Sequence, residues 1–347
     1  MKYNLAFIGF GNVGQGLATI LADKKAMLKE RYGFDFQVVA ISDIKKGSIY
    51  NEAGLKLKEI LRLARKTGTI EDYEGGRKDL SSIEIIEKSN ADIVLEATWT
   101  NLENGEPGLT HIKKALENGK HVATTNKGPI ALAYHELMRT AKAHNVFLRF
   151  EGTVMSGTPA INLALEDLAG AHVNTVRGIV NGTTNYILTR MEKGATYKGA
   201  LEEAQRLGYA EADPTMDVEA WDPVAKIIIL ANVVMGGSLK VKDVEREGIT
   251  KITLSDIKAA KKAGERIKLI AKAWRESGKV KAKVSPEKVP LTDVLAHIEG
   301  TLNALTFNTD VLGDVTVVGR GAGGIEAGYA LLSDMLAIHR YLSGKVS

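Results

Sequence analysis

The sequence predicts an α/β protein that begins with a doubly wound, parallel sheet carrying helices on both faces. Short apolar runs, typical of strands buried on both faces, alternate with helical patterns in the first part of the chain. A glycine-rich turn joins the first run to the first helical pattern, and polar turns follow the later runs. Ligands of such sheets bind beyond the carboxyl ends of the strands, so we expect the binding residues in these turns.

Composition excludes several classes of protein. The 347 residues suit two or three domains, and 44% hydrophobic with 25% charged residues is ordinary for a globular chain. A net charge of +4 without basic runs interleaved with aromatics argues against a nucleic-acid partner. No stretch approaches the roughly 18 apolar residues of a membrane span and no signal peptide is evident, so we expect a cytoplasmic protein. The absence of cysteine excludes disulfides, thiolate metal sites and cysteine nucleophiles.

The first strand is expected at residues 4–8, and the turn after it has the spacing of a dinucleotide-binding loop. Its first glycine permits the tight turn, its second lets the backbone approach a pyrophosphate, and its third lets helix and strand pack closely. The helix start that follows supplies free N–H groups and a positive dipole end for phosphate. The expected coenzyme-binding residues here are Gly9, Gly11, Asn12, Val13 and Gly14.

The second strand, expected at residues 36–41, ends at Asp43 and bears on the choice of coenzyme. An acidic residue at this strand end normally binds the ribose hydroxyls and favours NAD. Lys45 and Lys46 follow at once and suit the 2′-phosphate of NADP, although a solvated basic loop explains them equally well. The sequence therefore predicts NAD or NADP without choosing between them.

Further strands are expected at residues 91–98 and 120–124, with a helix at 109–118 between them and a mostly helical segment before them. The second of these strands leads to Lys127, which therefore lies at a carboxyl strand end, where ligands bind. A solvated loop lysine is the alternative interpretation. The alternation as a whole is the Rossmann-type pattern of a nucleotide-binding domain.

In the second half of the chain the pattern changes. A glycine-bearing turn and a helix precede an expected strand at 172–180 that belongs to a different sheet. Residues 181–185 form a polar turn that opens a helix; they suit a small polar ligand, and a capped helix start explains them equally well. Residues 255–276 predict one basic amphipathic helix packed on a sheet. Glycines at 319–324 precede the last helix and either return to the coenzyme site or form a plain tight connection.

The segment from Gly208 to Met235 combines acidic residues with a long apolar run. Asp222 is expected to cap a helix that begins at Pro223, and Lys226 lies one turn later on the same face. A capped helix with a surface ion pair explains both residues. The apolar run after Lys226, however, is expected to bury the helix and to remove the lysine from bulk water. Desolvation brings a lysine toward proton transfer near neutral pH, whereas nearby carboxylates oppose that shift.

Together these motifs resemble the homoserine dehydrogenase family. The matching segments stand in the family's order and span nearly the whole chain. They are GFGNVG at 9–14, EATWTN at 96–101, TTNKGPIA at 124–131, EGTVMSGTP at 151–159, NGTTNYIL at 181–188, GYAEADPTMDVEAWDPVAK at 208–226 and GRGAGG at 319–324. The resemblance implies a reversible, NAD(P)-dependent interconversion of L-homoserine and L-aspartate 4-semialdehyde, on the route to threonine and methionine.

The resemblance also implies roles for individual residues. Lys226 and Lys127 are candidates for proton transfer or polarisation at the reacting oxygen, and Asp222 for orienting the lysine and the substrate hydroxyl. Glu211 and Asp217 are expected to hold the substrate's ammonium group. The other expected contacts are Gly182 and Thr183 for the substrate, and Asp43, Lys45, Thr98, Lys127 and Gly321 for the coenzyme.

Members of the family also bind a monovalent cation, typically sodium, largely through backbone oxygens. The corresponding residues are Glu151, Val154, Ser156 and Thr158. The resemblance further implies a nucleotide-binding domain at 1–134 and 321–347, and an inserted α+β substrate and dimerisation domain at 135–320. Its dimerisation part is expected at about 150–165 and 291–320, in a homodimer. We expect neither a C-terminal regulatory domain, and hence no threonine feedback through one, nor a fused aspartate kinase.

Two other classes remain as alternatives. A dehydrogenase of the same architecture with another substrate need not keep the acidic residues and Lys226 together, and a non-catalytic NAD(P) sensor would lose the acid–base lysines, both of which are present here. Two departures from the family pattern bear on coenzyme preference and affinity. Trp99 stands where a proline is common, and the glycines at 319–324 lack the usual threonine-alanine after them.

Overall fold

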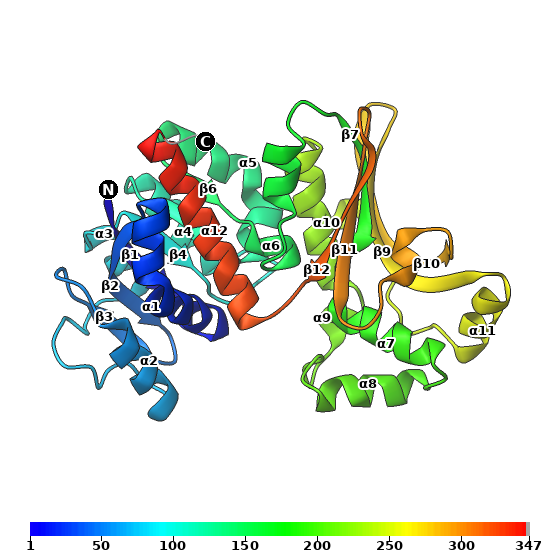
Figure 1. Cartoon of the computed structure of the whole chain (residues 1–347), viewed down its shortest axis with the longest axis horizontal. Helices are drawn as coiled ribbons and strands as arrows, with labels where there is room; N and C mark the ends of the chain where they lie inside the picture. Colours follow the sequence, from blue (N-terminus) through cyan, green and yellow to red (C-terminus); the bar gives the residue numbers. More distant parts are fainter. Residues whose placement is uncertain (345–347) are drawn as a thin grey trace. The chain divides into compact units, whose positions relative to one another are not determined.

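A computed structural model describes residues 1–344 as two compact units. The first unit consists of Met1–Gly157 together with the segment from Gly323 onward, and the second of Thr158–Ala322. The second unit is therefore an insertion, and the last helix of the chain returns to the unit in which the chain begins (Figure 1).

The first unit contains a six-stranded sheet of order β3-β2-β1-β4-β5-β6, in which only β3 is antiparallel to its neighbour. Its strands are β1 (Lys2–Ile8), β2 (Asp35–Asp43), β3 (Gly47–Tyr50), β4 (Ile93–Glu96), β5 (His121–Thr124) and β6 (Leu148–Arg149). The order reverses between β1 and β4, which is the point where doubly wound sheets bind ligands at the carboxyl ends of their strands. The predicted fold class is confirmed.

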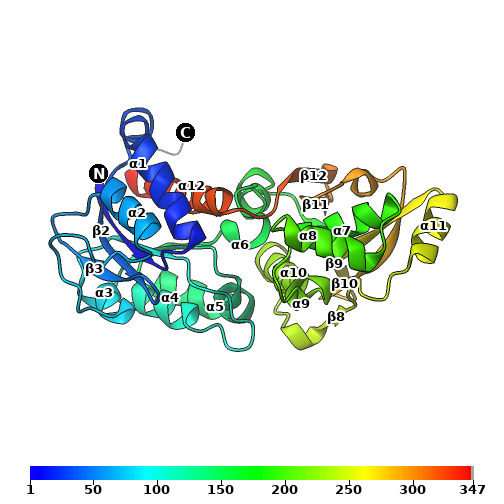
Figure 2. The same ribbon diagram turned by 90° about the horizontal axis from the view of Figure 1, so that it is seen from below.

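Helices cover both faces of this sheet (Figure 2). They are α1 (Asn12–Tyr32), α2 (Leu57–Lys66), α3 (Ser82–Lys88), α4 (Gly108–Glu117), α5 (Lys127–Ala143), α6 (Gly152–Met155) and α12 (Gly324–Ser343). Helices α1 and α12 approach so closely that a Cβ added to Gly16 would lie 2.2 Å from the oxygen of Gly324. Glycine at this crossing lets the C-terminal helix pack against the helix that begins at the glycine-rich turn.

The boundary between the units differs from the expected one near residue 134. Helix α5 continues to Ala143, and β6 then pairs in parallel with β5 as the last strand of the first sheet. Phe150, directly after β6, is buried. Residues 135–157 belong to the first unit because this strand and the contacts around it complete the first sheet.

The second unit has its own six-stranded sheet, of order β12-β11-β7-β9-β10-β8, and only the β10–β8 pair is parallel. Its strands are β7 (Val173–Ile179), β8 (Val244–Arg246), β9 (Glu265–Glu276), β10 (Lys279–Pro290), β11 (Leu302–Thr309) and β12 (Gly313–Arg320). Its helical segments are η1 (Leu163–Asp167), α7 (Gly182–Glu192), α8 (Tyr197–Arg206), α9 (Thr215–Val218), α10 (Trp221–Val234), η2 (Val241–Asp243), α11 (Leu254–Lys262) and η3 (Val294–His297). The expected second sheet and its α+β character are confirmed.

Helix α10 forms much of the interior of this unit. Every residue from Pro223 to Val233 is buried, as the apolar run predicts. Although this helix is very apolar, no helix within residues 1–344 is both long and apolar enough to cross a membrane.

The single helix expected at residues 255–276 is wrong. Helix α11 ends at Lys262, Gly264 follows with a φ of +74°, and strand β9 occupies Glu265–Glu276. Glycine adopts that left-handed conformation readily, so it ends the helix. The apolar residues after Gly264 fit the spacing of a helical stripe, but they form strand β9, which pairs with β7 and β10. The interior position of β9 in the sheet buries side chains on both of its faces.

Candidate active site

The glycine-rich turn between β1 and α1 has the geometry that its three glycines predict. Gly9 has a φ of +96°, and a Cβ added to it would lie 2.5 Å from the oxygen of Ala97. A Cβ on Gly14 would lie 2.5 Å from the oxygen of Gly9, whereas one on Gly11 would meet nothing within 4 Å. Gly9 and Gly14 are thus needed for packing, and Gly11 presents bare backbone to open space.

Helix α1 begins directly in this turn, with Gly11 at its N-cap and no side chain capping it. Asn12 and Val13, the other expected coenzyme contacts of the turn, are its first two residues. Uncapped N–H groups at a helix start attract anions, and the dipole of a 21-residue helix adds to the attraction.

Asp43 braces the same turn from the end of β2. Its Oδ2 accepts a hydrogen bond from the backbone N–H of Phe10 at 2.7 Å, and its Oδ1 accepts from the N–H groups of Lys45 and Lys46 at 2.9 and 3.0 Å. Sequence reasoning places this carboxylate at the ribose but misses the structural task. Asp43 holds the glycine-rich turn and the basic turn together.

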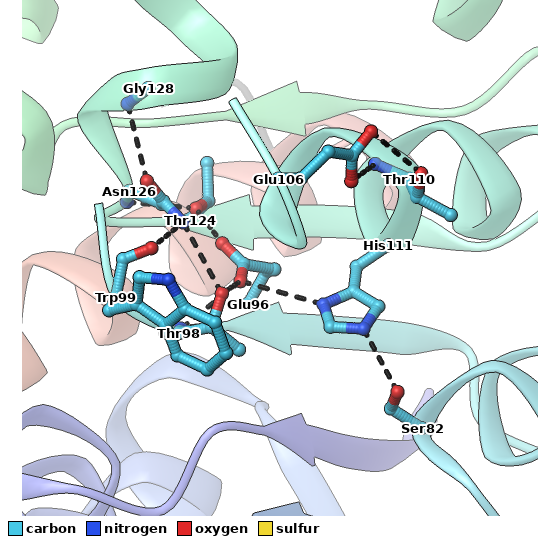
Figure 3. A network of polar contacts seen from close by, with 10 residues as sticks. All are labelled: Ser82, Glu96, Thr98, Trp99, Glu106, Thr110, His111, Thr124, Asn126 and Gly128. Carbon is cyan, nitrogen blue, oxygen red and sulfur yellow. Dashed lines mark hydrogen bonds and ion pairs between the residues drawn. The ribbon is translucent and has the colours of Figure 1, made fainter. Parts of the chain in front are cut away.

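A buried polar network lies where β4 and β5 end (Figure 3). The carboxylate of Glu96, the last residue of β4, is fully buried. Its Oε2 accepts from the hydroxyl of Thr124 at 2.9 Å, while its Oε1 accepts from the backbone N–H of Thr98 at 3.1 Å and from the Thr98 hydroxyl. His111 lies on the other side, with Nδ1 3.8 Å from Oε1 of Glu96.

The expected catalytic Lys127 is the first residue of α5, beside this network. Asn126 caps the helix, because its Oδ1 accepts from the N–H of Gly128 at 3.2 Å. The prediction that Lys127 follows the carboxyl end of a strand is correct, since β5 ends at Thr124.

In the second unit, Lys226 and Asp222 form an ion pair on α10. The ammonium nitrogen of Lys226 lies 2.7 Å from Oδ2 of Asp222 and donates to the backbone oxygen of Val180 at 2.6 Å. Lys226 is only 6% exposed, so the expectation of a lysine removed from bulk water is confirmed. The expected helix cap is wrong: the helix begins at Trp221 after Ala220 in the left-handed region, and Asp222 lies inside the first turn.

Asn181 joins the two aspartates of the site. Its Nδ2 donates to Oδ1 of Asp217 at 2.6 Å and to Oδ2 of Asp222 at 3.0 Å, so both amide hydrogens are used. Its Oδ1 accepts from the N–H of Thr184 at 2.9 Å and caps α7. The sequence prediction named the turn but not this residue. The sequence feature that could have identified Asn181 is its place at the first position of the turn, where a helix cap is expected.

The pKa of Asp217 reflects its place in this cluster. Burial, and secondarily the neighbouring Asp222, raises the pKa of Asp217 above its usual value, while the Asn181 amide opposes the shift. Lys226 pairs with Asp222, whereas the amide of Asn181 contacts Asp217. A cation that approached Asp217 would favour its ionised form.

The other expected substrate residues surround α7 and the segment before α9. Thr183 donates from Oγ1 to the backbone oxygen of Tyr209 at 2.7 Å, and a Cβ on Gly182 would lie 2.8 Å from the oxygen of Thr301. Glu211 is exposed, and its backbone oxygen accepts from Gln205 at 3.2 Å. The structure thus brings Asp222 and Lys226 into direct contact, links Asp217 to Asp222 through Asn181, and leaves Glu211 on the surface of the same unit.

The expected cation residues divide between the units. Glu151, Val154 and Ser156 belong to the first unit around α6, and Thr158 opens the second, where its Oγ1 donates to the oxygen of Arg320 at 3.0 Å. Ser156 has a φ of +53°, and its buried Oγ has no hydrogen-bond partner among residues 1–344.

Gly321, expected at the coenzyme, is in the second unit, where a Cβ on it would lie 2.0 Å from Nδ2 of Asn303. From Gly323 onward the chain is again part of the first unit. The glycines at 319–324 therefore span the boundary between the units.

Comparisons with known proteins agree with this arrangement. The family model described as "Homoserine dehydrogenase, NAD binding domain" matches residues 9–151, and the one described as "Homoserine dehydrogenase" matches residues 159–336. A homoserine dehydrogenase of Methanocaldococcus jannaschii is 47% identical over 99% of both chains. An NAD(+)-dependent homoserine dehydrogenase of Pseudomonas canavaninivorans is 43% identical over 99% of this chain and 98% of its own. A hyperthermophilic archaeal homoserine dehydrogenase mutant solved with NADPH has a TM-score of 0.85 at 32% identity, covering 98% of both chains.

Proposed function

The chain belongs to the homoserine dehydrogenase family, and on that premise we propose how its residues share the work of an NAD(P)-dependent oxidoreductase. The first unit binds the coenzyme at the carboxyl ends of β1 and β4. The cluster Asn181, Asp217, Asp222 and Lys226 binds the amino acid and moves its hydroxyl proton. The observation that carries this assignment is the buried lysine paired with one of two linked aspartates.

The substrate's ammonium group binds at Asp217, with Glu211 as a second carboxylate. Asp217 fits this role because it is a partly buried carboxylate whose contact with Asn181 is to a neutral amide, and a cation beside it favours its ionised form. Asn181 holds both carboxylates in place through its two amide hydrogens, which makes the site rigid before the substrate arrives. Gly182 and Thr183 border the same turn.

Lys226 exchanges the proton of the substrate hydroxyl. Two of its three N–H donors are used by Asp222 and Val180, so the third position on the nitrogen is left for the reacting oxygen. During oxidation of L-homoserine, a neutral Lys226 accepts the proton from the hydroxyl oxygen as hydride leaves the carbon that bears this oxygen; during reduction, the ammonium group returns the proton to the oxygen. Bound NAD(P) accepts or donates the hydride. Lys127 is the second proposed catalytic residue, with polarisation of the reacting oxygen as its role.

The coenzyme binds with its pyrophosphate at Gly11 and the start of α1. Gly11 fits this role because its backbone borders open space and no side chain caps the helix. Asp43 keeps one acceptor position on Oδ2 for a ribose hydroxyl, and Lys45 follows at the turn that can meet a 2′-phosphate. The coenzyme is therefore NAD or NADP, and the binding titrations decide the preference. Thr98 and Gly321 are further proposed contacts.

A monovalent cation binds at the loop after β6. The loop offers backbone oxygens of Glu151, Val154 and Ser156, with Thr158 completing the proposed set. The buried Ser156 hydroxyl has no hydrogen-bond partner among residues 1–344, which supports a polar ligand at this loop. Initial rates in sodium chloride and in choline chloride at equal ionic strength test the cation site, together with the line width of the ²³Na signal. Identical rates and no broadening of the ²³Na signal would contradict the site.

Two copies of the chain associate through β12 and the neighbouring part of the second unit. Strand β12 is the last in its sheet and pairs only with β11 among the described residues. Val318 on this strand and Val311 and Leu312 in the turn before it are exposed. An exposed edge with apolar side chains is normally covered by a partner. Light scattering of wild type and Val318→Lys tests the dimer, which the lysine should weaken.

The initial rate of L-homoserine oxidation with NAD and, separately, with NADP tests the whole assignment, beside a binding titration of each coenzyme. Turnover with at least one coenzyme is expected. Binding without turnover would mark that coenzyme as an inhibitor, and a folded protein that turns over with neither would contradict the assignment.

A further inference from the structure

We propose that Glu96 is a positioning residue for coenzyme binding: its buried carboxylate holds the Thr98–Trp99 backbone and the start of α5 in one fixed arrangement. This inference rests on the proposed coenzyme site. Glu96 ends β4, beside the point where the strand order reverses, and the loop that it holds therefore borders the crevice at the carboxyl ends of β1 and β4.

Asn126 contacts both threonine hydroxyls that bond to Glu96. The N–H of Asn126 donates to Oγ1 of Thr124 at 3.0 Å, and its Nδ2 donates to Oγ1 of Thr98 at 3.3 Å. Each threonine hydroxyl thus accepts a hydrogen bond from Asn126 and donates its own hydrogen to Glu96 (Figure 3). Both oxygens of Glu96 act as acceptors, and the backbone N–H of Thr98 adds a third donor.

Only a carboxylate satisfies this pattern. A glutamine at position 96 has the same shape but replaces one acceptor oxygen by an NH₂ group. That group would face a donor on either side, from Thr98 or from Thr124, and a buried donor would lose its acceptor. Because Glu96 and Thr124 are fully buried, water cannot take the place of the lost partner.

The same network determines the shape of the loop beyond Thr98. The second hydrogen of Asn126 Nδ2 bonds to the oxygen of Trp99 at 3.1 Å, so the asparagine amide is fully used. A Cβ on Gly128 would lie 2.3 Å from the oxygen of Asn101, which shows how closely the loop packs on the first turn of α5. A shift of Glu96 would therefore move the loop and the residue before Lys127 together.

His111 supports Glu96 from the opposite side. Its Nε2 lies 2.9 Å from Oγ of Ser82, and its Nδ1 faces Oε1 of Glu96 at 3.8 Å. The Nδ1 separation is too long for a hydrogen bond, so His111 packs against the carboxylate, and its Nε2 joins α4 to Ser82 at the start of α3. The carboxylate is therefore held between elements of the scaffold on one side and the coenzyme loop on the other.

The test compares Glu96→Gln with Glu106→Gln. Glu106 is a nearby carboxylate that accepts from the N–H and hydroxyl of Thr110 at the start of α4 but has no bond to the network, so it is the matched control. In E96Q the coenzyme Kd, measured by NAD(P)H fluorescence, should rise about tenfold or more because a bond to a charged group is lost. The KM for L-homoserine should stay within about twofold, since the substrate cluster is in the other unit.

E106Q should bind coenzyme like wild type. A Kd for E96Q within about twofold of wild type would overturn the proposal, and so would an equal loss of coenzyme and homoserine affinity, because a general loss of structure affects both. Where E96Q does not fold, Thr124→Val gives the decision, since it removes one donor to Glu96 without changing size. If a Gly11 variant loses coenzyme affinity while E96Q and T124V retain it, the proposed coenzyme site is supported and only the proposed role of Glu96 is contradicted.

Discussion

The ammonium group of Lys226 donates a hydrogen bond of 2.6 Å to the backbone oxygen of Val180, 46 residues earlier in the chain. Val180 follows β7 and precedes the turn that opens α7, so this bond ties α10 to the turn carrying Asn181. The ammonium group of Lys226 is thus oriented by the main chain on one side and by Asp222 on the other.

Replacing Lys226 by alanine should lower kcat about 10²–10⁴-fold, because a residue that exchanges the proton acts in the chemical step. Coenzyme binding should stay near the wild-type value, since the nucleotide turn is in the other unit. Steady-state rates beside NAD(P)H fluorescence titrations measure both. Lys198→Ala, which removes an exposed lysine of α8, is the control. Near-normal turnover of K226A would show that another group moves the proton.

Replacing Asn181 by aspartate separates the two tasks of this residue. The carboxylate still accepts from Thr184 and caps α7, but it offers a third negative charge to Asp217 and Asp222 in place of two donors. We expect kcat/KM for L-homoserine to fall about 100-fold or more. The two aspartates lose the donors that hold them in place, and the new carboxylate repels both of them.

Thr196→Ala is the matched control for the cap of N181D. Thr196 caps α8 through the N–H of Gly199 and touches neither aspartate, so T196A should lose about 1 kcal/mol of stability without loss of activity. An N181D enzyme with unchanged kcat/KM would mean that the bridge between the carboxylates is unimportant.

Replacing Asp217 by asparagine should make the protein more stable at neutral pH while it loses activity. Burial raises the pKa of Asp217 in the folded state above its unfolded value near 3.8, so the folded state binds the proton more tightly. The stabilisation from this proton is complete below pH 3.8 and disappears as pH rises through the folded-state pKa. Asparagine removes the cost of the buried charge.

Thermal unfolding of wild type and D217N across pH measures this effect. The Tm of D217N should exceed that of wild type at pH values well above the folded-state pKa, and the difference should shrink as the pH falls toward 3.8. A D217N protein that is less stable than wild type at every pH would show that the ionised carboxylate stabilises the fold.

Alanine substitutions in the glycine turn should separate coenzyme binding from packing. Gly11→Ala should cost at most about 1 kcal/mol of stability, because its new Cβ meets nothing within 4 Å, yet that Cβ occupies the space needed by the pyrophosphate. Gly14→Ala should cost about 1–3 kcal/mol, because its Cβ would lie 2.5 Å from the oxygen of Gly9.

Chemical denaturation and coenzyme titration of G11A and G14A check this pair. We expect tightly folded G11A with weak NAD(P)H binding. If G11A binds the coenzyme normally, the pyrophosphate does not approach the backbone at this residue.

The helix expected at 255–276 illustrates where local patterns lead to error. An amphipathic helix stripe and a buried strand both contain apolar residues at short spacing, and the sequence of β9 satisfies either pattern. Gly264, in the left-handed region, was the local signal that a helix ends there. Pairing with β7 and β10 makes this segment a strand. A local pattern does not record this pairing, because β7 is distant in the sequence and β10 comes later in the chain.

Features that depend on near neighbours could be predicted from the sequence: the glycine turn before α1, the alternation of strands and helices in the first unit, the position of Lys127 after a strand, and the spacing of Asp222 and Lys226. Each follows from backbone conformation or from one turn of helix. Long-range contacts, in contrast, make Asn181 the link between Asp217 and Asp222, bury Glu96 among donors, and extend the first unit to residue 157. Asn181 lies 36 and 41 positions from its two partners. Contacts over such distances arise only when sheets and helices bury their apolar faces, and no local pattern in the chain records them.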